Sequence, residues 1–96
     1  MLSEGEKPRL TVSPKRFSTA VGGEAVFQCN VEGSSSATRV EWIRADGRQL
    51  SARAFISEDH TLSLRRVEST DEGRYICIAT NRYGRSQEEV GLTVSG

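Results

Sequence analysis

One short segment carries the strongest structural signal in this chain: Asp71-Glu72-Gly73-Arg74-Tyr75-Ile76-Cys77. From Gly73 onward it alternates, so Tyr75 and Cys77 fall on one face of an extended strand and their neighbours on the other. The same period of two continues through residues 73–81. Residues 81–84 then have the composition of a hairpin turn, with a glycine that tolerates positive φ. We therefore predict a strand over 73–81 that turns back into the last strand of the chain.

The rest of the chain shows the same short alternating runs, and no helical period of 3.6 residues is visible. Further strand-like runs lie at 9–13, 17–21, 24–32, 39–45, around 50, at 55–56, at 62–64 and at 90–94. Pro14 interrupts the first run, as proline does at a sheet edge or where a strand changes sheets. Turns at Gly22-Gly23 and Asp46-Gly47 separate the others. Strands at this spacing predict an antiparallel β-sandwich.

The alternation also predicts the core, because one face of each strand collects the apolar side chains. These inward positions are Ala25, Phe27, Cys29, Val40, Trp42, Leu62, Leu64, Tyr75, Cys77 and Leu92. Two sheets packed on these faces would bury them together. A slip of one residue would expose the apolar set of a strand, so the register is well specified.

Length and composition limit the functional classes. The chain has 96 residues, 35% of them hydrophobic and 27% charged, which suits one globular domain. We expect residues 1–7, which are polar and aperiodic, to be a linker or an artificial start of the chain, and 8–96 to be the domain. Thirteen basic and thirteen acidic residues cancel, which argues against a nucleic-acid partner. No apolar run approaches the roughly 18–20 residues of a membrane span, so no direct membrane insertion is expected.

Four features together resemble the intermediate (I-type) set of the immunoglobulin superfamily. They are Cys29, Trp42, the Leu62-x-Leu64 pair and the segment from Asp71 to Cys77. The resemblance covers most of the chain. It implies an all-β, immunoglobulin-like antiparallel sandwich of seven to eight strands with Greek-key connections.

The resemblance also implies roles for single residues. Cys29 and Cys77 would form a disulfide, and closing that loop would contribute about 4 kcal/mol to stability. Trp42 would pack against the sulfur atoms, and the Tyr75 hydroxyl would bond to backbone a few residues upstream. Asp71 would cap the turn or pair with Arg53.

The state of the two cysteines separates two classes of protein. An oxidised pair suits a secreted or cell-surface protein, whereas muscle and cytoskeletal domains of this type often keep buried reduced thiols. A metal site does not fit, because two cysteines and one histidine cannot supply four ligands at a known spacing.

No residue set for catalysis or cofactor binding is visible. His60 is the sole histidine and falls in a polar turn, where a solvated loop residue is expected. The chain lacks a nucleophile elbow, a phosphate-binding glycine loop and a zinc-type histidine pair. We expect a protein that is not an enzyme and takes no cofactor.

An apolar stripe is the first candidate partner surface. Ile43, Ile76 and Ile78 fall on the outward faces of two neighbouring strands and are expected to face solvent. Contiguous exposed apolar patches often mark interaction sites, so this sheet is a candidate for a protein partner, including a second copy of the chain. The alternative is that isoleucine is favoured in strands even on wet faces.

Arginine provides the second candidate surface. Eleven of the thirteen basic residues are Arg, and Arg39, Arg82 and Arg85 are expected to gather at one end of the sandwich. Such a group could bind an anionic partner, with a sulfated glycan as the less favoured form. The alternative is a scattered set of solvated charges.

The sequence thus favours a protein-interaction or adhesion module of a longer multidomain protein at the cell surface or in the extracellular matrix. The alternative is a structural or scaffold domain of an intracellular muscle or cytoskeletal protein.

Overall fold

The computed structural model describes residues 7–32 and 39–96. Within them the chain forms eight strands and one short 3-10 turn, η1. Their bounds are β1 Arg9–Ser13, β2 Arg16–Ala20, β3 Ala25–Glu32, β4 Arg39–Arg44, β5 Ala54–Ile56, β6 Leu62–Leu64, η1 Ser69–Asp71, β7 Gly73–Asn81 and β8 Gly84–Ser95. The last strand is longer than the sequence pattern indicates, because its pairing with β7 continues to the hairpin turn.

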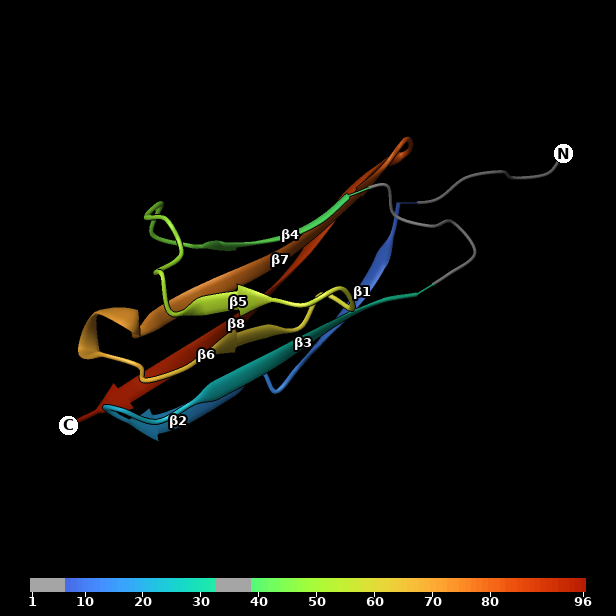
Figure 1. Cartoon of the computed structure of the whole chain (residues 1–96). Helices are drawn as coiled ribbons and strands as arrows, with labels where there is room; N and C mark the ends of the chain where they lie inside the picture. The colour runs from blue at the N-terminus through green and yellow to red at the C-terminus, as the bar shows by residue number, and fades with distance from the viewer. Residues whose placement is uncertain (1–6, 33–38) are drawn as a thin grey trace, which may run out of the picture.

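The strands form two four-stranded sheets, with orders β1-β3-β6-β5 and β2-β8-β7-β4 (Figure 1). The expected all-β sandwich is confirmed. One pair departs from the antiparallel rule, because β2 runs parallel to β8. The chain changes sheets at Pro14, between β1 and β2, as the interruption of the first run indicates.

The core lies between the two sheets and contains the inward positions of the alternating strands. Its buried members are Val12, Ala25, Phe27, Cys29, Trp42, Leu62, Leu64, Val67, Tyr75, Cys77, Val90 and Leu92. Val40 is half-buried and packs against this cluster. Phe27 lies at its centre, with its ring centroid 6.4 Å from the rings of both Phe17 and Tyr75.

A disulfide joins the two sheets through this core. Cys29 on β3 and Cys77 on β7 are bonded, with their Cα atoms 6.5 Å apart. Trp42 lies directly opposite Cys77 in the register of β4 and β7. Its indole N–H donates to the carbonyl oxygen of His60 at 2.8 Å. His60 is half-buried and has a φ of 70°. Because its carbonyl accepts this hydrogen bond, the turn at His60 helps to orient the core tryptophan.

Candidate interaction surface

Ionisable side chains converge at one end of the core, around a buried arginine that the sequence analysis missed. Arg44 follows Val40 and Trp42 on the inward face of β4, and its side chain is only 5% exposed. Its guanidinium donates to the Tyr75 hydroxyl at 2.9 Å, to the Glu72 carbonyl at 3.0 Å and to Asp46 at 3.1 Å. Hydrogen bonding to Asp46 raises the pKa of Arg44 and lowers the pKa of that carboxyl.

A second buried charge lies beside it. Asp71 is 1% exposed and accepts two hydrogen bonds from Arg53, at 3.0 and 3.1 Å. The Glu68 backbone N–H donates to the same carboxylate at 2.9 Å. Burial by itself would raise the pKa of Asp71, but the bonds from Arg53 and Glu68 outweigh it and the pKa is lowered. The Tyr75 hydroxyl donates to the Asp71 carbonyl, four residues upstream.

This cluster of Arg44, Asp46, Arg53, Asp71 and Tyr75 stabilises the fold, because its polar groups already form hydrogen bonds with one another and with nearby backbone. In the described part of the chain no buried side-chain nitrogen or oxygen lacks a hydrogen-bond partner. Residues 7–32 and 39–96 also place no three His, Cys, Asp or Glu side chains where they could hold a metal ion. Over the same ranges, no helix has the length and apolarity needed to cross a bilayer.

The outer face of the β2-β8-β7-β4 sheet is the surface on which the sequence analysis placed its candidates. Cross-strand partners divide it into rows, since directly opposite residues share a face. Three successive rows cross β4, β7 and β8, namely Arg39–Thr80–Arg85, Glu41–Ile78–Gln87 and Ile43–Ile76–Glu89. The next row lies past the end of β4 and crosses β7, β8 and β2, as Arg74–Gly91–Arg16.

The three isoleucines do not form one exposed stripe. Ile43 is 39% exposed and lies opposite the half-buried Ile76, so these two are adjacent at the surface. Ile78 is only 7% exposed, and the expectation that it faces solvent is wrong. It lies on the central strand β7 with Glu41 and Gln87 on either side. Long side chains in such positions cover an apolar neighbour with their aliphatic stems.

The three arginines are only partly brought together. Arg39 and Arg85 are exposed and lie on either side of Thr80 in one row. Arg82 lies in the turn between β7 and β8, with its guanidinium carbon 5.3 Å from the centroid of the Tyr83 ring. It therefore belongs to the hairpin tip and not to that row.

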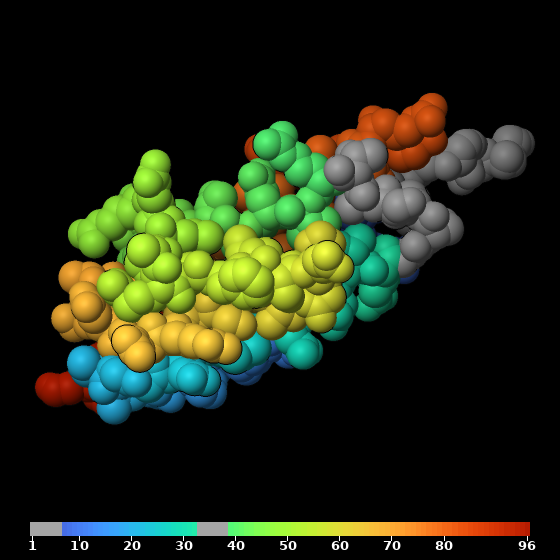
Figure 2. Space-filling model, in the orientation of Figure 1, coloured from blue at the N-terminus to red at the C-terminus, as the bar shows by residue number. Residues whose placement is uncertain are grey.

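Two other surface features were not singled out from the sequence, and the first is on the opposite sheet. Phe55 is 67% exposed and Val26 is 45% exposed, and both lie beside Ser63 in one row of β5, β6 and β3. Figure 2 shows this side of the molecule, with the residues of β5 and β6 in the middle of the view. The alternation of β3 already places Val26 on the outer face, whereas β5 is too short to show a period.

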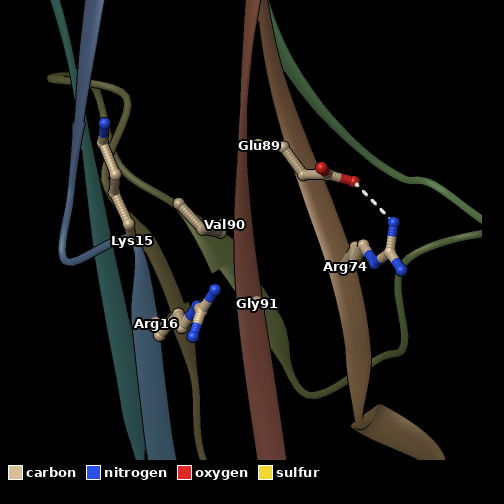
Figure 3. A pocket seen from close by; sticks show the side chains of 6 residues that line it. All are labelled: Lys15, Arg16, Arg74, Glu89, Val90 and Gly91. Atoms are coloured by element: carbon tan, nitrogen blue, oxygen red, sulfur yellow. Dashed lines mark ion pairs between the residues drawn. The ribbon is translucent and has the colours of Figure 1, made fainter.

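The second feature is a hollow of about 440 Å³ at the β2 edge of the other sheet. Lys15, Arg16 and Arg74 surround it, together with Glu89, Val90 and Gly91 (Figure 3). Glu89 pairs with Arg74 at 3.7 Å. Sequence reasoning could not find this group, because Arg16 and Arg74 are far apart in the chain and meet only through the pairing of β2 and β7 with β8.

Comparison with known proteins relates the fold to a family. A family model described as the immunoglobulin I-set domain matches residues 8–94. Roundabout homolog 1 of Homo sapiens is 35% identical over 89 residues, which cover 93% of this chain and 5% of that protein. The chain therefore spans a small fraction of the curated relatives it matches.

Solved structures show the same architecture in different settings. The mouse nectin-like molecule 4 full ectodomain superimposes with a TM-score of 0.74 at 28% identity, covering 93% of this chain and 30% of that one. The twitchin kinase region from C. elegans gives a TM-score of 0.79 at 33% identity, covering 93% of this chain and 16% of that one.

Proposed function

Because the chain belongs to the immunoglobulin I-set family, we propose that it is a protein-interaction or adhesion module of a longer multidomain protein. The domain occupies residues 8–96, and residues 1–7 are a linker. It acts at the cell surface or in the extracellular matrix. The domain binds and carries out no catalysis, and it takes no cofactor.

The observation that carries this proposal is the adjacent Ile43 and Ile76 on the outer face of the β2-β8-β7-β4 sheet. Ile43 is 39% exposed, and the row ends in the charged Glu89. An apolar centre with a polar rim is the usual anatomy of a protein interface. Because the centre is small, we propose a weak homophilic contact in which two copies pack these faces together.

The compartment is supported by two independent observations. The Cys29–Cys77 bond is a feature of proteins that fold in oxidising environments. The similarity to the nectin-like ectodomain points to the same compartment. Similarity to the twitchin kinase region favours the alternative, an intracellular scaffold domain. Thiol titration of denatured protein from its native source separates them, since two reactive thiols would contradict the extracellular proposal.

Sedimentation of purified variants tests the homophilic contact. We expect the wild-type chain to self-associate, and Ile43→Asp or Ile76→Asp to shift it toward monomer while the thermal transition stays cooperative. Phe55→Asp is the matched control, because it places the same charge on an exposed apolar residue of the opposite sheet. If Phe55→Asp abolishes association and the isoleucine variants do not, the interface is on the other face.

Ile78→Asp provides an internal contrast. Its side chain is 7% exposed, so an aspartate there would bury an unpaired charge. We expect it to lower the stability of the folded domain, whereas Ile43→Asp should not. Chemical denaturation of both variants measures the difference.

A further inference from the structure

Gly91 occupies a position where the fold itself does not require glycine. It lies inside β8, paired on both sides, and glycine in a strand interior is destabilising relative to alanine. Its φ is not in the left-handed region, and a Cβ built there would meet nothing within 4 Å. Glycine inside a strand often marks a place where a ligand or another backbone approaches closely.

The neighbours of Gly91 indicate what approaches. Arg16 on β2 and Arg74 on β7 are its direct cross-strand partners, so two exposed guanidinium groups stand on either side of a bare backbone. Lys15 precedes Arg16 and adds a third cation at the rim. Figure 3 shows Lys15 and Arg16 on one side of β8 and Arg74, paired with Glu89, on the other, with Gly91 on β8 between them.

The hollow contains more positive charge than the chain itself neutralises. Glu89 is its one acidic lining residue, and its carboxylate lies 3.7 Å from Arg74, longer than a close charge-assisted hydrogen bond. Both side chains of that pair are largely solvated, at 48% and 73% exposure. Among the described residues, neither Lys15 nor Arg16 has an ion pair. Two cations are therefore available to an external anion.

We propose that this hollow binds a carboxylate of an acidic segment on a protein partner. The carboxylate lies over Gly91 and accepts hydrogen bonds from Arg16 and Arg74, and Glu89 is displaced from Arg74 when it binds. Planar guanidinium groups match carboxylates in a bidentate geometry. The proposal rests on the proposed function, because it adds a charged contact to the same sheet of a protein-interaction module.

The position of the hollow supports a protein over a sulfated glycan. Its row is next to the row of Ile43, Ile76 and Glu89, so one partner could place an apolar group on the isoleucines and an acidic group over Gly91. A sulfated glycan carries repeating charges and needs a longer basic track. Along β8 the acidic Glu89 lies two residues from Gly91 and breaks such a track.

Titration with a capped hexaglutamate peptide tests the proposal, followed through the arginine Nε–Hε signals in NMR. We expect the signals of Arg16 and Arg74 to shift, and Arg16→Gln to weaken binding about threefold, as for a solvated charge pair. Gly91→Val should weaken binding by a similar factor with no change in charge, because its side chain takes the space over β8 that the carboxylate would occupy. Glu89→Gln should tighten binding about twofold, since it removes the competing carboxylate.

Arg65→Gln is the matched control, because Arg65 is an exposed arginine outside the hollow. Equal weakening by Arg65→Gln, or unchanged binding by Gly91→Val, would overturn the proposal. A sulfated oligosaccharide that binds more tightly than the peptide, with the same dependence on Gly91, would assign the hollow to a glycan instead. A wild-type chain that stays monomeric but binds the peptide with this dependence on Gly91 would overturn the homophilic contact and support the hollow as a carboxylate site.

Discussion

Arg44 lies against Tyr75 inside the sandwich, with its guanidinium carbon 5.2 Å from the ring centroid and its Nη1 donating to the hydroxyl at 2.9 Å. The Tyr75 hydroxyl in turn donates to the Asp71 carbonyl. The arginine therefore connects β4 to the turn before β7. The buried charge of Arg44 is tolerated because each nitrogen of its guanidinium group donates to an acceptor.

Arg44→Met should lower the free energy of unfolding by about 2–3 kcal/mol. The methionine keeps the aliphatic bulk but removes the arginine donor from the Glu72 carbonyl and one of two donors from the Asp71 carbonyl, which keeps the Tyr75 hydroxyl. Arg48→Met is the control, because Arg48 is 68% exposed and reaches Asp46 only at 3.7 Å. We expect the control to stay within about 0.5 kcal/mol of wild type in urea denaturation. A similar loss in both variants would contradict the role assigned to Arg44.

Gly73→Ala should also destabilise the domain, by about 1–3 kcal/mol. Gly73 has φ of +148°, and a Cβ there would lie 3.0 Å from Nη2 of Arg44. Part of the cost comes from this contact and part from the backbone conformation. The same substitution in an Arg44→Met background should cost less, and a double-mutant cycle measures the difference. Strict additivity would show that the close approach has no energetic consequence.

Acid should remove a contribution to stability that belongs to Asp71. Its folded-state pKa is lowered, so as pH falls the unfolded chain binds the proton first. The contribution is therefore complete above the unfolded pKa, about 3.9, and is lost as pH falls through the folded value. In urea denaturation between neutral pH and pH 2, the stability gap between wild type and Asp71→Asn should narrow. An unchanged gap across this pH range would contradict the contribution assigned to Asp71.

Trp42→Ala should cost about 3–5 kcal/mol, as large core truncations do. The residue is 3% exposed, and the substitution also leaves the His60 carbonyl without the indole donor. Trp42→Phe loses that hydrogen bond but keeps most of the side-chain volume, so its cost should be clearly smaller. A small shift in the unfolding midpoint of Trp42→Ala would show that the tryptophan is not central to the core.

Local pattern was sufficient for the strands and most of the core. Tyr75 and Cys77 alternate with outward residues, and the same parity in β3 and β4 identified Phe27 and Trp42 as inward. The prediction of inward residues succeeds because the side chains of a strand alternate between its two faces, so a buried face produces an apolar residue at every second position. The same parity also places Arg44 inward, and this signal was missed because a charged residue is seldom assigned to a core.

The surface could not be derived in the same way. Ile78 has an outward parity but is covered by neighbours on β4 and β8, and those neighbours are set by register and not by its own strand. Parity says which face a side chain lies on, whereas its exposure depends on what stands beside it. The isoleucine stripe was therefore overestimated, and the exposed Phe55 was missed.

By itself, the amino-acid order determined an all-β domain with a cysteine and tryptophan framework, since alternation and spacing are local properties of the chain. Only the tertiary structure decided that Arg16 and Arg74 stand on either side of Gly91, and that Arg39 and Arg85 share a row while Arg82 does not. Those relations join strands distant in sequence through backbone hydrogen bonds. Their geometry exists only once the sheet has formed.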